Sequence, residues 1–229
     1  MRGVVIPRGF DVDAACAHLA KRDRKLAKWM RRIGPLDHDF DARFDPVDAL
    51  ARSILYQQLS GKAAATITAR VRQRMPRGGK ITARGIDAVD DAGLRAAGVS
   101  RNKIAALRDL AAKSHAGIVP RPAQLERMAD QDLIEHLVQV RGIGRWTVEM
   151  LLMFRLGRPD VLPVDDLGIR KGAQIVHGFD DLPVPRDLRE FGERWGPYRT
   201  LASFYLWKVV EAANPPKPGA KPVKRSQDS

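Results

Sequence analysis

A turn with two closely spaced glycines, Val140-Arg-Gly-Ile-Gly-Arg-Trp-Thr147, constrains the fold of this chain more than any other feature. It joins two segments whose apolar residues recur at helical spacing, 130–138 and 143–156. Gly142 and Gly144 allow positive φ and leave no side chain between the backbone and a ligand. Amides at the start of the second helix then point at an anion, and the helix dipole favours negative charge there. The pattern predicts a helix–hairpin–helix that binds a DNA phosphate without reading bases.

The phosphate site predicted in this hairpin comprises Gly142, Gly144, Arg145 and Thr147. The alternative is an ordinary connection between helices, in which the glycines only permit close packing. The charge of the chain favours a polyanion as ligand, because 40 Lys and Arg against 27 Asp and Glu give a net charge of +13 and a pI near 10.4. We therefore expect double-stranded DNA as the partner. We expect no membrane partner, because no apolar stretch is long enough to span a bilayer.

Helical periodicity also dominates the rest of the sequence and predicts an all-α fold. Strand-like patterns are confined to residues 4–6 and 161–162. Besides the hairpin pair, we expect a first helix that includes residues 14–30 and is capped by Asp11 or Asp13. A second helix is opened by Asp45-Pro46, and a third is capped by Ser60. Two short helices within 87–110 meet at 98–100, and two more are expected over 187–195 and 199–212.

The cysteine and histidine content limits the chemistry open to this chain. Cys16 is the only cysteine, which excludes an internal disulfide and a cysteine-ligated zinc or iron–sulfur centre. The five histidines lack metal-ligand spacing, so we expect no cofactor and no metal held by side chains. The first residues show no secretory signal, which predicts a cytoplasmic, nucleoid-associated protein.

Four motifs follow one another in a specific order along the chain. The first is Ile54-Leu-Tyr-Gln-Gln-Leu-Ser60, and the second is Gly142-Ile-Gly-Arg-Trp-Thr147 in the hairpin. The third is Asp165-Asp-Leu-Gly-Ile-Arg170, whose second carboxylate lies twenty residues after Trp146, and the fourth is Glu193-Arg-Trp-Gly-Pro-Tyr-Arg199. Together they resemble the helix–hairpin–helix–Gly/Pro–Asp DNA glycosylases, and within them the branch of 3-methyladenine DNA glycosylase II.

The resemblance covers roughly residues 46–211 and implies two helical subdomains with a DNA-binding cleft between them. We expect an N-terminal segment over 1–45 that packs with a C-terminal segment over 161–213 carrying the catalytic carboxylate. The central subdomain is expected over 46–160, with the hairpin at 130–156. Larger members of the branch begin with an additional β domain, and this chain is too short at its N-terminus for one, which implies the compact form. Residues 214–229 are rich in proline and lysine and are predicted to be disordered.

The adjacent carboxylates Asp165 and Asp166 are the candidates for the catalytic group. When the C1′–N bond of a nucleotide breaks, positive charge develops on the deoxyribose. An ionised carboxylate stabilises this charge and orients the attacking water. The resemblance favours Asp166, because Ile169 and Arg170 follow it in the register of the family. Asp165 is the alternative, since Val-Asp resembles the pattern of sister branches, and either carboxylate can cap the helix expected after it.

Trp146 occupies a position that decides the expected product. Bifunctional relatives carry a lysine there, two residues after the second hairpin glycine, and its amine attacks C1′ to form a Schiff base. An indole cannot act as that nucleophile. The resemblance therefore implies a monofunctional enzyme without lyase activity, which hydrolyses the N-glycosidic bond, releases the free base and leaves an abasic site.

Aromatic residues near the motifs suggest a pocket for a cationic base. Purines alkylated at N3 or N7 carry positive charge, and each well-placed ring contributes about 0.5–2 kcal/mol to their binding. The resemblance places Trp207 in this pocket. The further candidates are Tyr56, Trp146, Met150, Tyr198 and Tyr205. The alternative for each aromatic residue is packing in the core.

A wedge must fill the gap that a flipped nucleotide leaves in the duplex. In the family, a residue of the segment Gln57-Gln58-Leu59 intercalates, and the register points to Gln58, with Leu59 as the neighbour able to substitute. The alternative is that the glutamines satisfy backbone groups at a helix end. The resemblance also implies a monovalent cation on main-chain carbonyls of the hairpin, expected around Val138, Val140 and Ile143.

The leading hypothesis from the sequence is a monomeric glycosylase for alkylated purines, of the 3-methyladenine and 7-methylguanine class, in base excision repair. One alternative is a glycosylase for deaminated or oxidised bases. The other is a non-enzymatic DNA-binding module that uses only the hairpin. The Asp166 motif and the aromatic residues favour an enzyme over such a module.

Overall fold

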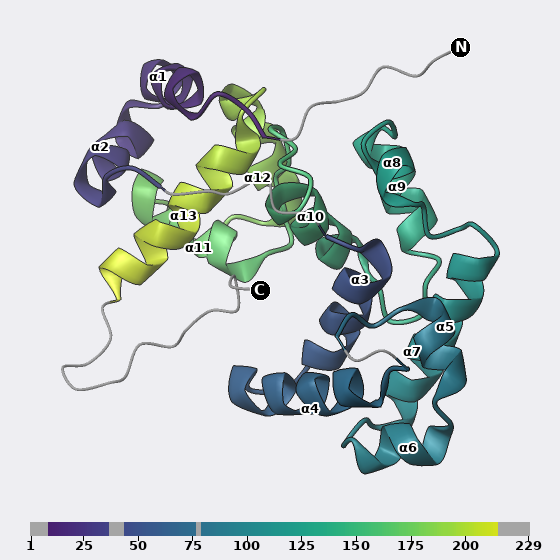
Figure 1. Ribbon diagram of the computed structural model, residues 1–229. Helices are drawn as coiled ribbons and strands as arrows, with labels where there is room; N and C mark the ends of the chain where they lie inside the picture. Colours follow the sequence, from purple (N-terminus) through teal and green to yellow (C-terminus); the bar gives the residue numbers. More distant parts are fainter. Residues whose placement is uncertain (1–8, 37–43, 77–78, 215–229) are drawn as a thin grey trace. The chain divides into compact units, whose positions relative to one another are not determined.

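The computed structural model describes residues 9–36, 44–76 and 79–214, and over these residues it contains helices and no strand (Figure 1). The all-α fold predicted from the sequence is therefore confirmed. The strand pattern at 4–6 and the disorder predicted for 215–229 lie outside the described residues. Among the helices in the described ranges, none combines the length and the apolar character needed to cross a membrane.

The chain divides into two compact units. Unit 1 contains the described residues 44–76 and 79–148, and unit 2 contains residues 9–36 and 149–214. The sequence-distant residues 9–36 and 149–214 thus share one core. The helix α10 (Arg145–Phe154) begins in unit 1 and ends in unit 2.

In unit 1, α7 (Arg101–His115) packs against α3 (Pro46–Tyr56) and α5 (Ala83–Ala88) (Figure 1). Leu107 and Leu110 of α7 are fully buried, and burial of each such side chain stabilises the fold by about 1.5–3 kcal/mol. The other helices of this unit are α4 (Gly61–Arg74), α6 (Asp91–Ala96), α8 (Pro122–Leu125) and α9 (Asp130–Leu137).

Short polar side chains begin the helices of unit 1 where the sequence predicts. Asp45 Oδ1 accepts the amide of Val47 at 2.9 Å at the start of α3, and Ser60 Oγ accepts the amide of Ala63 at 3.4 Å at the start of α4. The break at 98–100 separates α6 from α7, as expected. A further break comes before α6, because Asp90 Oδ1 accepts the amide of Gly93 at 2.7 Å and caps a new helix.

In unit 2, α13 (Arg199–Ala213) lies beside α11 (Leu167–His177) and α2 (Arg24–Ile33) (Figure 1). Leu201 and Leu206 of α13 are fully buried in this core. The remaining elements are α1 (Val12–Arg22), α12 (Pro185–Phe191) and the 3-10 helix η1 (Gly192–Trp195).

The single helix predicted over residues 14–30 is wrong, because Asp23 divides it into α1 and α2. Asp23 is extended, with φ −141° and ψ 92°, and its Oδ1 accepts the amide of Leu26 at 3.0 Å as the N-cap of α2. Its Oδ2 accepts the indole N–H of Trp195 at 2.8 Å. The apolar spacing continues across Asp23, so the break depends on a buried hydrogen bond to a residue far along the chain.

Candidate active site

The turn between α9 and α10 forms the predicted hairpin within unit 1. The Val140 amide donates to Leu137 O at 3.1 Å, and the Ile143 amide donates to Val140 O at 3.0 Å. Gly142 has φ +80°, which disfavours any residue with a Cβ. Of the two hairpin glycines, only Gly142 uses the positive φ that glycine allows, and Gly144 does not.

The backbone at the start of α10 is open to a ligand. This helix begins at Arg145, two residues later than the sequence pattern suggests, and Gly144 O accepts the amide of Thr147 at 3.0 Å. A Cβ built on Gly144 meets nothing within 4 Å. Gly142, Gly144 and Arg145 are exposed and Thr147 is half-buried. A helix N-terminus with an accessible backbone and a neighbouring arginine suits an anion such as phosphate.

The main chain proposed for a monovalent cation belongs to the same turn. Val138 is the C-cap of α9, and Val140 O already accepts the Ile143 amide. Among the described residues, no group of three or more His, Cys, Asp or Glu side chains is placed to hold a metal ion.

Residues 57–60, called the wedge loop below, follow α3 in unit 1. Gln57, Gln58 and Leu59 are exposed, and Gln58 has φ +56°. Gln57 Nε2 donates to Gly142 O at 2.7 Å, so this glutamine satisfies a backbone group of the hairpin. Tyr56, at the end of α3, is half-buried. The guanidinium of Arg52 lies over its ring, 4.9 Å from the ring centroid.

In unit 2, Asp166 and Trp207 meet directly. Trp207 Nε1 donates to Asp166 Oδ1 at 2.9 Å, and the Ile169 amide donates to the same oxygen at 2.9 Å. Asp166 is the N-cap of α11 and is half-buried, whereas Asp165 is exposed. The carboxylate is therefore held by a helix N-terminus and an indole, while it keeps partial access to solvent.

The ring of Trp207 belongs to an aromatic cluster. Phe154 stacks on it with 5.7 Å between centroids and 13° between planes, and Phe204 lies 6.2 Å away. Met150 is one helical turn before Phe154 on α10, so both lie on one side of that helix. Phe204 is buried, as core packing predicts, whereas Phe154 is half-buried and supports Trp207.

Tyr198 lies at the other end of α13 from this cluster. It is the N-cap of α13, about 14 Å along the helix axis from Trp207. Its ring contacts Phe10 and His18, with centroids 6.1 Å and 5.4 Å away. The fold thus brings Trp207 to Asp166 but directs Tyr198 toward the N-terminal residues of unit 2.

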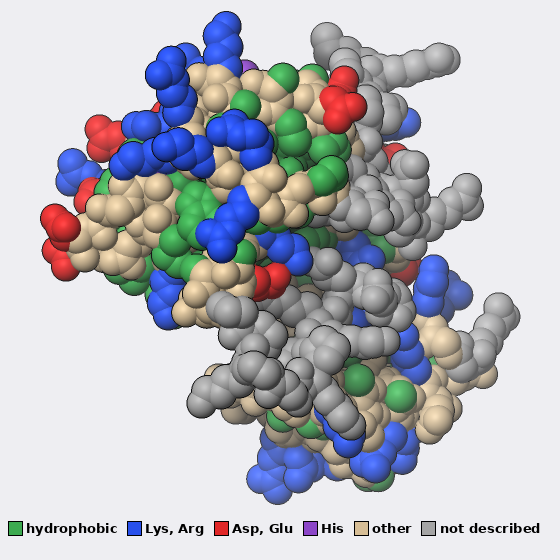
Figure 2. All heavy atoms as spheres, turned by 90° about the vertical axis from the view of Figure 1, so that its left-hand side faces the viewer, with side chains coloured by type: hydrophobic (Ala, Val, Ile, Leu, Met, Phe, Trp, Pro, Cys, Tyr) green, Lys and Arg blue, Asp and Glu red, His purple; other side chains and the backbone are tan. Residues whose placement is uncertain are grey.

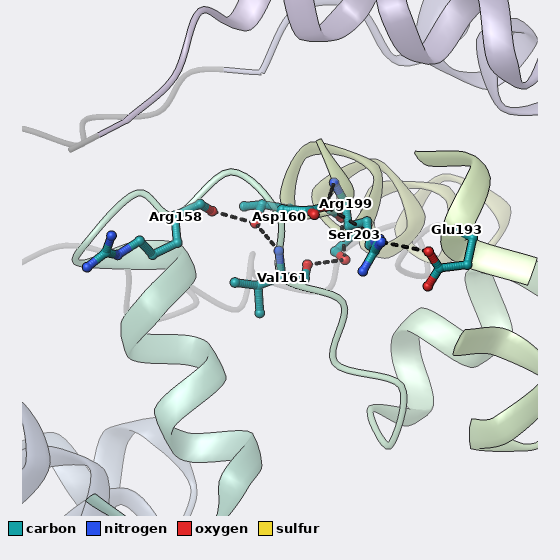
Figure 3. A network of polar contacts seen from close by, with 7 residues as sticks. Arg158, Asp160, Val161, Glu193, Arg199 and Ser203 are labelled. Atoms are coloured by element: carbon teal, nitrogen blue, oxygen red, sulfur yellow. Dashed lines mark hydrogen bonds and ion pairs between the residues drawn. The ribbon is translucent and has the colours of Figure 1, made fainter. Parts of the chain in front are cut away.

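A polar network on α13 holds the segment that leads to Asp166. Thr200 Oγ1 donates to Arg158 O at 2.6 Å and accepts the Val161 amide at 3.0 Å, and Ser203 Oγ donates to Val161 O at 3.4 Å (Figure 3). Thr200 and Ser203 are buried. The strand-like pattern at 161–162 forms no strand, in agreement with the all-α prediction, because these side chains satisfy the backbone in place of a neighbouring strand.

A second network continues from the same helix start. Arg199 Nη2 donates to Glu193 Oε2 at 2.9 Å, and the Arg199 amide donates to Asp160 Oδ1 at 3.3 Å (Figure 3). Residues from the fourth motif, at 193–199, therefore fix the loop before the third motif.

Basic side chains gather on α1 and α2 of unit 2. Figure 2 views this side, and Lys and Arg side chains are prominent in its upper part. The exposed basic residues of the two helices are Lys21, Arg22, Arg24, Lys25, Lys28, Arg31 and Arg32. Such a surface attracts a polyanion.

The family model described as "HhH-GPD superfamily base excision DNA repair protein" matches residues 51–197. This chain belongs to the HhH-GPD superfamily. The match begins within α3 and ends just before α13, so it includes the wedge loop, the hairpin and Asp166.

Relatives of this HhH-GPD protein cover nearly its whole length. It is 40% identical over 202 residues to "DNA-3-methyladenine glycosylase 1" of Schizosaccharomyces pombe, which is 88% of this chain and 89% of that protein. The solved S. pombe 3-methyladenine DNA glycosylase in complex with abasic DNA has a TM-score of 0.75 and 36% identity, and covers 85% of this chain and 95% of that chain. The DNA-3-methyladenine glycosidase of Bacillus halodurans has a TM-score of 0.79 and 35% identity, with 88% and 91% covered.

Two glycines of this HhH-GPD chain shape the site but were not singled out from the sequence. A Cβ on Gly168 would lie 2.8 Å from Trp207 Cδ1 and 3.0 Å from Asp166 Oδ1, and a Cβ on Gly172 would collide with the backbone of Leu206. Small residues four apart on α11 therefore admit α13 closely enough for the indole to reach the carboxylate. The sequence signal that could have indicated this close helix packing is the i, i+4 spacing of the two glycines.

Proposed function

We propose that this HhH-GPD protein is a monofunctional DNA glycosylase that hydrolyses the N-glycosidic bond of alkylated purines, of the 3-methyladenine and 7-methylguanine class, in double-stranded DNA. The observation that carries the proposal is the half-buried Asp166 carboxylate, held by the Trp207 indole and the Ile169 amide. The names of the relatives that match along nearly the whole chain support this substrate class.

The proposed chemistry uses Asp166 as an electrostatic catalyst. As the C1′–N bond breaks, its electron pair leaves with the base, and positive charge grows on the deoxyribose. The ionised carboxylate of Asp166 stabilises this charge and orients a water molecule. Water oxygen then bonds to C1′ and its proton is accepted by the carboxylate or by solvent. An alkylated purine is a cation before cleavage and leaves as a neutral base, so it needs no protonation.

The proposed pocket is formed around Trp207 on α13 and Met150 on α10. The stacked Phe154 holds the indole in one orientation, while the indole N–H holds Asp166. The ring of Trp207 thereby connects base recognition with the position of the carboxylate. Tyr56 and Trp146 belong to unit 1 and remain predictions from the family resemblance alone. The ring contacts of Tyr198 with Phe10 and His18 argue against a place in this pocket. Tyr205 is buried and its hydroxyl donates to Gly34 O at 3.2 Å, which favours a core role.

The proposed binding mode places a DNA phosphate at Gly142, Gly144, Arg145 and Thr147. Gln58, or Leu59 beside it, fills the gap left by the flipped nucleotide. Paired DNA would resist this step by a few kcal/mol, which favours damaged bases. Acting on chromosomal DNA, the protein would work at the nucleoid as a monomer.

A panel of duplexes, each with one lesion, tests the proposal. The panel contains 3-methyladenine, 7-methylguanine, hypoxanthine, ethenoadenine, uracil and 8-oxoguanine, and chromatography identifies the released base. We expect release of the methylated purines at the highest rates. Release of uracil or 8-oxoguanine alone would contradict the substrate class, and binding of all duplexes without any release would contradict an enzyme.

A further inference from the structure

We propose that one face of α7 sets the position of the wedge loop relative to the DNA-binding hairpin, with Lys103 and Gln57 as positioning residues for base flipping. This inference rests on the proposed glycosylase function and adds residues that act through others. All of the contacts that support it lie within unit 1.

Four residues of α7 form the face in question. Lys103, Ala106, Asp109 and Lys113 recur at spacings of three, three and four residues, which places them along one side of the helix. Its first residue contacts the wedge loop and its last two contact the hairpin. A single rigid helix therefore supports both elements.

Lys103 holds the chain immediately before the wedge residue. Its ammonium Nζ donates to Leu55 O at 2.7 Å and to Gln57 O at 2.8 Å. The last carbonyls of a helix lack partners within the helix, and a cation there also interacts favourably with the dipole. Burial lowers the pKa of Lys103 below its ordinary value of 10.5, because the ammonium is partly removed from solvent.

The residue that follows this clamp has an unfavourable backbone conformation. Gln58, with φ +56°, is the one non-glycine residue with positive φ in the described ranges. A conformation of this kind is unfavourable for a residue with a side chain and persists only where the surroundings enforce it. The two hydrogen bonds of Lys103 to the backbone just before Gln58 supply that restraint.

Gln57 connects the wedge loop with the hairpin turn. Its Nε2 donates to Gly142 O at 2.7 Å. A Cβ built on Gly142 would lie 3.6 Å from Ala106 Cβ of α7 and 3.9 Å from Gln57 Oε1. The hairpin glycine is thus placed between α7 and the glutamine.

Asp109 and Lys113 fix the hairpin to the same face of α7. Asp109 Oδ2 accepts the Arg141 amide at 2.7 Å, and Lys113 Nζ donates to Asp109 Oδ2 at 2.9 Å and to Gln139 O at 2.5 Å. Burial raises the pKa of Asp109, but the Arg141 amide and Lys113 outweigh it, and the net pKa is lowered. The carboxylate therefore stays ionised and continues to accept the Arg141 amide of the turn.

The wedge and the phosphate-binding hairpin must act on one duplex at a fixed separation. If the hairpin holds a phosphate, the contacts of Lys103 and Gln57 determine where Gln58 enters the base stack. Loss of either contact leaves phosphate binding in place but reduces insertion of the wedge. A role limited to stability would affect binding and insertion alike.

Two variants, Lys103→Met and Gln57→Ala, test whether wedge insertion can be lost while phosphate binding is kept. Gln57 is exposed, so its truncation leaves folding intact even if Lys103→Met does not fold. Three quantities are measured: the Kd for undamaged duplex, the fluorescence rise of 2-aminopurine placed beside a 7-methylguanine, and the single-turnover excision rate at saturating enzyme. We expect a Kd within threefold of wild type, and roughly tenfold losses in the fluorescence amplitude and the excision rate.

Lys113→Met is the matched control, because Lys113 lies on the same face of α7 and also donates to a carbonyl, but one in the hairpin. It is expected to weaken binding of undamaged duplex while the fluorescence amplitude at saturation is retained. Unchanged amplitude and rate in both Gln57→Ala and Lys103→Met would overturn the inference. If instead the wild type releases no base, the proposed function fails, and the fluorescence amplitudes still report whether α7 positions the wedge loop.

Discussion

Trp207 donates its indole N–H to Asp166 Oδ1 at 2.9 Å, so the residue predicted to bind the base also holds the residue predicted to catalyse its release. Phe154 stacks on the same indole, and Gly168 leaves the room that the contact needs. The proposed recognition of a base by Trp207 and the orientation of the carboxylate would therefore be coupled within unit 2.

Trp207→Phe should separate these two roles. The phenyl ring keeps an aromatic surface against Phe154 but cannot donate to Asp166. A hydrogen bond to a charged group contributes about 1.5–3 kcal/mol, so we expect the single-turnover excision rate to fall at least about tenfold. Binding to abasic-site duplex should change little. A rate equal to that of wild type would show that the indole N–H has no part in catalysis.

The two hairpin glycines should respond differently to alanine. Gly142→Ala forces a Cβ into the left-handed region and should cost about 1–2 kcal/mol in the free energy of unfolding. Gly144→Ala meets open space and should leave that free energy within about 0.5 kcal/mol. The methyl group would still obstruct a phosphate, so we expect roughly tenfold weaker duplex binding, the equivalent of one charge-assisted hydrogen bond. Urea unfolding and fluorescence anisotropy measure the two effects, and unchanged binding by Gly144→Ala would argue against a phosphate there.

His177 should make the stability of the fold depend on pH. Its side chain is 5% exposed, and burial lowers its pKa to about 4, although Asp23 Oδ2, 3.3 Å from Nε2, acts in the opposite direction. Between pH 6.5 and 4 the unfolded chain therefore binds a proton that the folded chain does not. The resulting stability is present above pH 6.5 and is lost as the pH falls. From pH 7.5 to 5.0 the loss is about 2 kcal/mol.

The His177→Gln variant provides the comparison for this effect, because it removes the titrating group and keeps a polar side chain. Urea unfolding at both pH values should show a loss about 2 kcal/mol larger in wild type than in the variant. Equal losses in the two proteins would place the pH dependence elsewhere.

The absence of lyase chemistry is a separate prediction. Trp146 lies in the first turn of α10 with 49% of its surface exposed, and its indole provides no amine for a Schiff base. Incubation with abasic-site duplex and borohydride should therefore yield no covalent complex. A trapped complex would show that another amine attacks C1′ and would contradict the monofunctional assignment.

Local signals made much of this fold predictable. The caps at Asp45 and Ser60 and the glycines of the hairpin each act within a few residues, so the sequence is sufficient to place them. The break at Asp23 was missed, because it depends on the side chain of Trp195, far away in the sequence. The hydrogen bond of Thr200 to the Val161 amide had no local signal for the same reason.

The candidate site shows the same division. Asp166 and Trp207 were proposed from motifs, but the sequence contains no signal for the hydrogen bond between them. The sequence does not distinguish Lys103 from other basic residues on helices. Only the packing of α7 against the end of α3 shows that it binds the carbonyls of Leu55 and Gln57. Contacts that depend on how helices pack cannot be derived from periodicity, since periodicity identifies the buried face and not its partner.

Asp166→Asn tests the central claim most directly. Asparagine is also a good N-cap, so α11 should form and the protein should bind abasic-site duplex as wild type does. Asp165→Asn, with the same change at the exposed neighbour, is the matched control. We predict that Asp166→Asn lowers the single-turnover release of 7-methylguanine more than about 100-fold, while Asp165→Asn stays within threefold of wild type. Wild-type release by Asp166→Asn, or a loss confined to Asp165→Asn, would contradict the account.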